Sequence, residues 1–225
     1  MEKIIRGVER FQEEVFPKER ALFEELALGQ HPRALMITCA DSRIDPNHIT
    51  QTMPGELFFL RNAGNIVPAY TAFQGAEAAT IEYAMSVLGL KHIIVCGHTD
   101  CGAMKGVLDP AAIAHLPAVS GWLRHSSCAC EVVKSRFGHE PGEIQLRHLI
   151  EENVVSQLVN LQTHPSVAAR LASGYLHLHG WVYEIGTGHV MSYDTAKRKF
   201  VPLHSSLPHV ERPAEAIGWA PAFTD

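Results

Sequence analysis

Short apolar runs recur along the chain and alternate with longer segments of helical periodicity. The runs span residues 34–38, 56–60, 92–96, 175–185 and 189–195. The first and third are almost continuously apolar, which is typical of strands buried on both faces of a parallel sheet. A Gly-rich turn at 186–188 joins the last two runs, so these two should pair antiparallel.

The segments between these runs predict helices. In the first of them, Ile4, Val8 and Phe11 follow helical spacing until Pro17 interrupts it. The expected helical regions are 3–29, 74–88, a segment after 102, about 112–136, about 143–162 and a short one after Pro165. Helices that alternate with short apolar strands predict an α/β fold. We expect a central sheet of four parallel strands plus a C-terminal antiparallel strand, flanked by helices.

The same pattern defines one domain with two appendages. Residues 1–201 form the predicted domain, with 1–29 as an N-terminal helical arm. Residues 202–225 are rich in proline, alanine and serine, lack periodicity, and are predicted to be a C-terminal tail.

Composition narrows the class of protein. The formal net charge of -5 disfavours a nucleic-acid partner, which would need a basic patch to meet phosphates. There is no apolar stretch of about 18 residues, so no membrane span is expected. The N-terminus lacks the apolar core of a secretory signal. We therefore expect a cytoplasmic protein.

Candidate metal ligands follow two of the predicted parallel strands. Cys39 ends the first strand, and His98 and Cys101 follow the third as an H-x2-C pair. The carboxyl ends of parallel strands meet at one edge of a sheet, where ligands commonly bind. Two cysteines and one histidine would leave the fourth tetrahedral position of zinc open, as in catalytic zinc sites.

Each part of this pattern is weak by itself. A cysteine at a strand end is most often a packed thiol, and a D-x-R sequence is most often an ion pair in a loop. Their combination is more specific, because Asp41 and Arg43 directly follow Cys39 in an otherwise apolar setting. An arginine can bind such a carboxylate through two parallel hydrogen bonds.

The sequence resembles the β-class carbonic anhydrases, and within them the plant-like branch. The resemblance rests on C-x-D-x-R at 39–43, H-x2-C at 98–101, and the stretches PGELFFLRNAGNIVP, GAEAATIEYAMSVLGLKHIIVCGH and LHGWVYEIGTG. It implies one zinc ion per chain on Cys39, His98 and Cys101. It also implies reversible hydration of carbon dioxide to bicarbonate by zinc-bound hydroxide, which Asp41, paired with Arg43, would orient.

The resemblance also implies a small apolar substrate pocket. By position, Phe58, Ala63 and Tyr83 match the pocket wall, although Tyr83 could equally be a core aromatic residue. Gln30 matches a glutamine whose amide binds substrate or product; without the resemblance it would be an ordinary loop residue. The backbone N–H of Gly102, at a helix start, offers a further donor.

The amphipathic arm implies a homodimer at least, because in the family it packs on a second subunit. Two alternative functions stay open: hydrolysis of carbon disulfide or carbonyl sulfide on the same site, and a non-catalytic zinc-containing scaffold. Asp100 is expected to be a helix N-cap, and Cys96 a core residue. Cys128 and Cys130 should face different directions on one helix.

Overall fold

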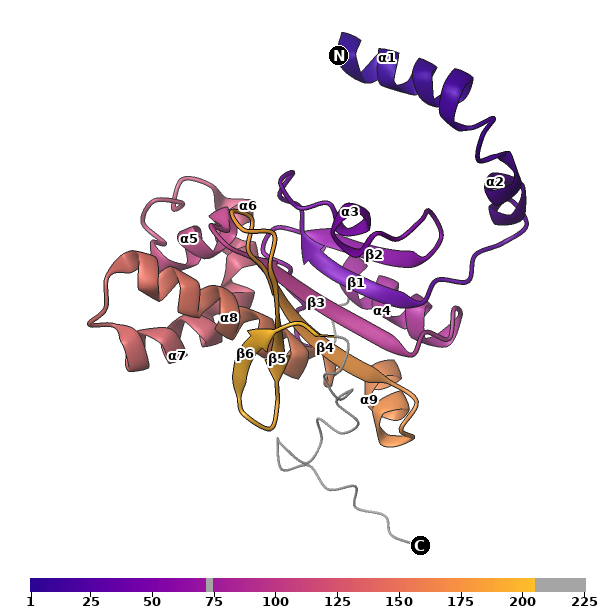
Figure 1. Cartoon of the computed structure of the whole chain (residues 1–225). Helices are drawn as coiled ribbons and strands as arrows, with labels where there is room; N and C mark the ends of the chain where they lie inside the picture. The colour runs from indigo at the N-terminus through magenta and orange to yellow at the C-terminus, as the bar shows by residue number, and fades with distance from the viewer. Residues whose placement is uncertain (72–74, 205–225) are drawn as a thin grey trace, which may run out of the picture.

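A six-stranded sheet forms the centre of the molecule (Figure 1), as seen in a computed structural model that describes residues 1–71 and 75–204. The strand order is β2-β1-β3-β4-β5-β6. The strands are β1 (Ala34–Cys39), β2 (Leu57–Asn62), β3 (His92–His98), β4 (His177–Tyr183), β5 (Val190–Asp194) and β6 (Lys199–Pro202).

The predicted sheet is confirmed, with one strand added. β2, β1, β3 and β4 are parallel, and β5 pairs antiparallel with β4. The additional strand β6 pairs antiparallel with β5. Its four residues begin with a lysine and end with a proline, so they carry little of the apolar signal that marks the other strands. Pro202, the first residue of the predicted tail, lies in β6; residues 205–225 of that tail lie outside the described residues.

The helices occupy most of the predicted segments. They are α1 (Glu2–Arg10), α2 (Arg20–Leu26), α3 (Pro46–Thr50), α4 (Ala76–Ser86), α5 (Gly102–Leu108), α6 (Pro117–Leu123), α7 (Ser127–Phe137), α8 (Gly142–Leu161) and α9 (Pro165–Ala172). Within residues 1–71 and 75–204, no helix has the length and hydropathy of a membrane span.

Two helical predictions need correction. The region predicted as one helix over about 112–136 begins only at Pro117, and a 3₁₀ turn over Arg124–Ser126 separates α6 from α7. Proline suits the first turn of a helix but not its interior, which explains the late start. The short helix α3 was not predicted. Pro46 starts it, and the Asp45 side chain accepts a hydrogen bond from the His48 backbone N–H.

Alternate residues of the central strands enter two separate cores. On one face, Leu35 and Ile37 of β1 pack with residues of α4, α7 and α8. On the other face, Met36 and Ile94 belong to a smaller cluster with α3 beneath it. The helix α8 can approach the first face closely because Gly97 and Gly180 present no side chain there. The strand ends are thereby held firmly between two layers.

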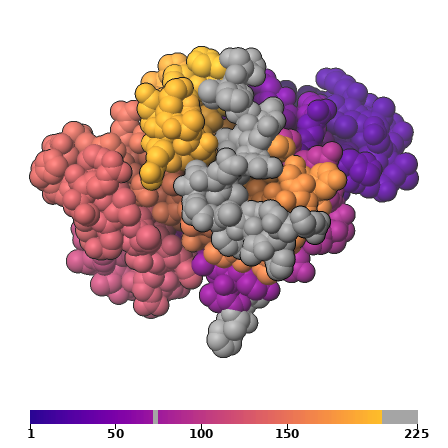
Figure 2. Space-filling model, turned by 90° about the horizontal axis from the view of Figure 1, so that it is seen from below, coloured from indigo at the N-terminus to yellow at the C-terminus, as the bar shows by residue number. Residues whose placement is uncertain are grey.

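The N-terminal arm stands apart from the sheet (Figure 1). A π-helical turn, Phe11–Val15, and the expected break around Pro17 separate α1 from α2. The apolar side of α1 is open: Ile4, Ile5 and Val8 are 64%, 53% and 52% exposed. Figure 2 places this arm at the opposite end of the molecule from α7 and α8. One chain alone therefore leaves the apolar stripe of α1 uncovered.

Candidate metal centre

Two neighbouring parallel strands bring the candidate ligands together. Cys39 is the last residue of β1 and His98 the last residue of β3, and these strands pair directly. Cys101 follows in the connection to α5. The two Sγ atoms and an imidazole nitrogen lie within 4.8 Å of one another, and all three residues are buried. The predicted grouping of these three residues is present in the fold.

The imidazole of His98 is oriented as a metal ligand would be. Its Nδ1 lies 2.9 Å from the Thr99 carbonyl oxygen, so this nitrogen carries the proton and donates. Its Nε2 is buried and has no hydrogen-bond partner among the described residues. A buried nitrogen with a free lone pair is costly unless a ligand engages it. A hydrogen bond that fixes the other ring nitrogen is usual for metal-bound histidine.

The two cysteine sulfurs carry opposite pKa shifts. A hydrogen bond from Cys101 is the largest cause that lowers the pKa of Cys39, to about 4, and His98 and the Gly64 N–H add to it. The pKa of Cys101 is raised because this thiol faces the Cys39 thiolate and is buried. A divalent cation would stabilise both thiolates at once. The residues present therefore fit a soft metal such as zinc.

Asp41 and Arg43 form the expected bidentate pair beside the ligands. Arg43 donates from Nε to Asp41 Oδ1 at 3.0 Å and from Nη2 to Asp41 Oδ2 at 2.7 Å. These side-chain bonds, helped by the Arg43 backbone N–H, hold the pKa of Asp41 well below its usual range. Asp41 Oδ2 lies 3.8 Å from His98 Nε2. An ionised carboxylate thus faces the metal centre.

Asp100 has a different place from the one predicted. Cys101, not Asp100, is the N-cap of α5, and no side chain caps that helix. Asp100 adopts a left-handed backbone conformation with a φ of 59°. Its Oδ2 accepts a hydrogen bond from Arg43 Nη1 at 2.9 Å. It also forms an ion pair with Lys105. Asparagine and aspartate tolerate this backbone region. The left-handed conformation directs the Asp100 carboxylate toward Arg43, so it does not cap α5.

Arg61 is a second residue that sequence reasoning missed. Its guanidinium donates to the carbonyl oxygens of Cys39, Asp41 and Ile44, at 2.9 to 3.0 Å. Because β2 pairs with β1, this side chain lies over the loop that carries Asp41 and Arg43. The only signal in the sequence was a charged residue at the end of an apolar strand.

The predicted substrate residues fall into two groups. Ala63 lies next to Gly64, whose N–H donates to Cys39 Sγ at 3.4 Å, and Gly102 directly follows Cys101. Gln30, Phe58 and Tyr83 lie elsewhere. Phe58 pairs with Leu35, four residues before Cys39, which corresponds to about 13 Å along the strand.

The second group gathers near the other end of the parallel strands. The rings of Phe58 and Tyr83 stack with their centroids 5.9 Å apart, and Tyr83 is 44% exposed. Gln30 is exposed and precedes β1, whereas Cys39 ends it. One chain therefore does not bring these three side chains to its own metal centre.

The remaining cysteines lie outside the centre. Cys96 is buried in the core, and burial raises its pKa to about 12. Cys128 is exposed and Cys130 is buried, so they face different directions as predicted.

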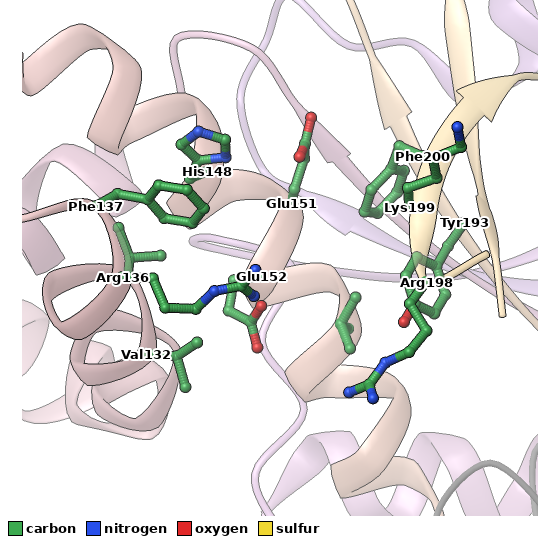
Figure 3. Close-up of a pocket in the computed structure, with 12 residues that line it drawn as sticks. Val132, Arg136, Phe137, His148, Glu151, Glu152, Tyr193, Arg198, Lys199 and Phe200 are labelled. Atoms are coloured by element: carbon green, nitrogen blue, oxygen red, sulfur yellow. The ribbon is translucent and has the colours of Figure 1, made fainter. Parts of the chain in front are cut away.

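A hollow of about 450 Å³ lies between α7, α8 and the β5–β6 hairpin (Figure 3), apart from the candidate metal ligands. His148, Glu151 and Glu152 enter it from α8, and none of the predicted site residues lines it.

Fold and site together define a class of protein: an α/β domain with a cysteine–histidine–cysteine group that could hold a metal ion at the carboxyl edge of its sheet. The comparisons with known proteins agree. The family model described as carbonic anhydrase matches residues 34–190. A carbonic anhydrase of Pseudomonas aeruginosa is 48% identical over 203 residues, which cover 90% of this chain and 92% of the relative.

Further relatives support the same assignment. A carbonic anhydrase of Synechocystis sp. is 46% identical over 212 residues, with 94% of this chain and 77% of the relative covered. The solved structure of the β-carbonic anhydrase CcaA is 46% identical, has a TM-score of 0.88, and covers 90% of this chain and 99% of that one. The chain belongs to the β-carbonic anhydrases, enzymes that hydrate carbon dioxide with zinc.

Proposed function

We propose that this chain is a zinc enzyme that interconverts carbon dioxide and bicarbonate, with one zinc ion on Cys39, His98 and Cys101. The observation that carries the proposal is the buried His98 Nε2, which lacks a hydrogen-bond partner among the described residues and lies beside two cysteine sulfurs. The names of the relatives favour carbon dioxide over carbon disulfide or carbonyl sulfide as substrate, and favour an enzyme over a scaffold. A cytoplasmic location stays a prediction from the sequence.

The metal and the carboxylate have separate tasks. Zinc at this centre would act as a Lewis acid and lower the pKa of a bound water, which makes hydroxide available near neutral pH. Asp41 stays ionised because Arg43 binds both of its oxygens. Its Oδ2 would accept a hydrogen bond from a water held at this centre and so direct the lone pair of that oxygen toward carbon dioxide. Arg43 holds Asp41 in place through both carboxylate oxygens.

The substrate pocket needs a second copy of the chain. Ala63 and the Gly102 N–H come from the chain that holds the metal. Phe58 and Tyr83 stack on each other and Gln30 precedes β1, all toward the other end of the strands from Cys39, so a partner would supply them. The exposed apolar side of α1 supports a homodimer. A β-carbonic anhydrase of Sordaria macrospora that is 28% identical, with a TM-score of 0.66, is one of two described as tetrameric.

Elemental analysis together with stopped-flow carbon dioxide hydration tests the proposal. We expect about one zinc per chain, and loss of both zinc and activity in Cys39→Ser and His98→Ala. Cys128→Ser is the matched control, because this thiol is exposed and does not belong to the group that could hold the metal. Full hydration activity in a protein without zinc would overturn the proposal.

A further inference from the structure

A single peptide group connects an indole to a metal ligand. The N–H of Gly64 donates to Cys39 Sγ at 3.4 Å. The carbonyl of the same peptide group belongs to Ala63, and it accepts from Trp122 Nε1 at 2.8 Å. Trp122 is in α6, far from this loop in the sequence. The hydrogen bonds therefore run from the indole through the peptide to the sulfur.

The backbone at this peptide is held in an unusual conformation. Gly64 has a φ of 85°, and a Cβ atom there would lie 3.0 Å from Met104 Cε and 3.1 Å from Ala103 Cβ. On its other side, the Gly64 carbonyl accepts from Asn153 Nδ2 at 3.0 Å. Only glycine adopts this region at little cost, so the sequence here serves to aim the N–H rather than to fill space.

Asn153 itself is fixed inside α8. It is 1% exposed, and its Oδ1 accepts from Ser126 Oγ and from Gln157 Nε2, both at 2.8 Å. These two bonds orient the amide so that Nδ2 points at Gly64. Gln157 and Asn160 extend the row along α8 and bind the backbone N–H and the carbonyl of Val67. Burial of several amides in a helix that could have been apolar is costly unless each amide is satisfied.

Hydrogen bonds to a thiolate reduce the electron density that the sulfur gives to a metal. A donor on the carbonyl side of a peptide polarises that peptide and strengthens the hydrogen bond made by its N–H. Groups beyond the ligands commonly tune a metal in this way. Trp122 is well suited to the task, because its indole can donate but cannot accept.

We propose that Trp122 and Asn153 are positioning residues for the N–H of Gly64, and so tune Cys39 as a metal ligand. Trp122 polarises the Ala63–Gly64 peptide at its carbonyl, and Asn153 fixes the Gly64 backbone through the carbonyl of the following peptide. The inference rests on the proposed metal function. It assigns a role in the metal centre to two residues that have no hydrogen bond to Cys39, His98 or Cys101. A purely structural role for both residues is the competing explanation.

Trp122→Phe separates the two explanations, because it keeps a six-membered aromatic ring packed against the core and removes the N–H donor. In protein loaded with Co²⁺, we expect the sulfur-to-cobalt charge-transfer absorption to move to longer wavelength, since Cys39 becomes a stronger electron donor. Zinc affinity, measured by competition with a chromogenic chelator, should fall about 10-fold, because the Gly64 N–H no longer holds the sulfur in its orientation. Asn153→Asp, which keeps both acceptor contacts and removes the donor, should move the absorption in the same direction.

Asn160→Ala is the matched control. It removes a hydrogen bond from α8 to the carbonyl of Val67, three residues beyond Gly64. It should lower the urea midpoint and leave the absorption where it is in the wild type. A structural role predicts that all three variants lose stability and none shifts the band, and this result would overturn the inference. Wild-type protein with no such band would instead overturn the metal site itself.

Discussion

Arg43 lies between two carboxylates, Asp41 and Asp100. Its Nε and Nη2 donate to the two carboxylate oxygens of Asp41. Its Nη1 donates to the Asp100 carboxylate, and its Nη2 also donates to the backbone carbonyl of Asp100. These contacts raise the pKa of Arg43 further above its usual range, so its charge is permanent. The guanidinium thus orients the carboxylate that faces the metal centre and ties it to the loop between the ligands His98 and Cys101.

The first prediction concerns this guanidinium. Arg43→Ala should keep the metal and lower turnover by about 10²-fold, the usual scale for loss of an orienting charged donor. Arg43→Lys should recover only part of the loss, because an ammonium group cannot bind both oxygens in parallel. Stopped-flow hydration and metal content are the measurements. Arg33→Ala, which removes an exposed pair with Glu56, is the control. Unchanged turnover in Arg43→Ala would contradict the role of the pair.

At the scale of elements, α8 packs against the sheet and also forms hydrogen bonds with the backbone of Gly64 and Val67 in the loop after β2. Gly180 is the point of closest approach, since a Cβ there would lie 2.9 Å from Val154 Cγ1 and 3.0 Å from Leu158 Cδ1. Two side chains at that spacing cannot both stay in place. The contact therefore depends on the absence of a side chain on β4.

The second prediction follows from this contact. Gly180→Ala should lower the free energy of unfolding by about 1–3 kcal/mol, the typical cost of overpacking a core. Urea unfolding followed by circular dichroism measures it. Gly186→Ala is the matched control, because a Cβ there would meet nothing within 4 Å. Equal stability of the two variants would show that α8 adjusts without cost.

His164 lies at the junction of the same loop with α9. It is the N-cap residue of α9 and 3% exposed, and its Nε2 is 3.0 Å from the carbonyl oxygen of Pro68. Burial lowers its pKa from the ordinary 6.5, only partly offset by that hydrogen bond. The folded protein therefore takes up this proton less readily than the unfolded chain does.

The third prediction is a pH dependence of stability. Since the unfolded chain binds the proton first, the contribution of neutral His164 is complete above about pH 6.5 and declines as the pH falls toward the lower folded-state pKa. Urea midpoints should thus drop between pH 7.5 and 5.5 more in the wild type than in His164→Gln. His31→Gln, a change at an exposed loop histidine, should leave the wild-type slope intact. Parallel slopes for the wild type and His164→Gln would contradict the prediction.

At the scale of the whole molecule, the chain is incomplete by itself in two places. The apolar side of α1 is uncovered, and the proposed pocket residues Gln30, Phe58 and Tyr83 lie toward the opposite ends of the strands from Cys39. A second copy of the chain would cover α1 and supply the proposed pocket residues. Assembly and activity should therefore fail together.

The fourth prediction tests this coupling. Val8→Glu places a charge on the 52% exposed apolar side of α1 and should shift the protein to monomers in sedimentation equilibrium. Hydration activity per chain should drop with it, while the bound zinc remains. Glu9→Gln, a change to another exposed residue of the same helix, is the control. A Val8→Glu monomer with full activity would show that each chain completes its own pocket.

The sequence by itself determined five strands of the sheet, the grouping of Cys39, His98 and Cys101 at one edge of it, and the family. Short apolar runs can be recognised from neighbouring residues alone. Residues at the carboxyl ends of parallel strands all lie at the same edge of the sheet. The Asp41–Arg43 pair was also readable, because residues two positions apart in extended chain outside a helix lie on the same side of the backbone. The break between α6 and α7 and the strand β6 were not readable, since no proline or glycine marks the turn at Arg124–Ser126 and β6 has almost no apolar pattern.

Only the tertiary structure decided which distant groups surround these ligands. Asp100 turns toward Arg43 because a left-handed residue redirects the chain there, and Arg61 covers the loop because β2 lies beside β1. Trp122 and Asn153 reach the carbonyls of Ala63 and Gly64 from helices that follow these residues by dozens of positions. The separation of Phe58 from Cys39 follows from strand register, which the hydrophobic pattern does not encode. Contacts of this kind depend on how the layers of helices and strands pack, so they cannot be predicted from a local sequence pattern.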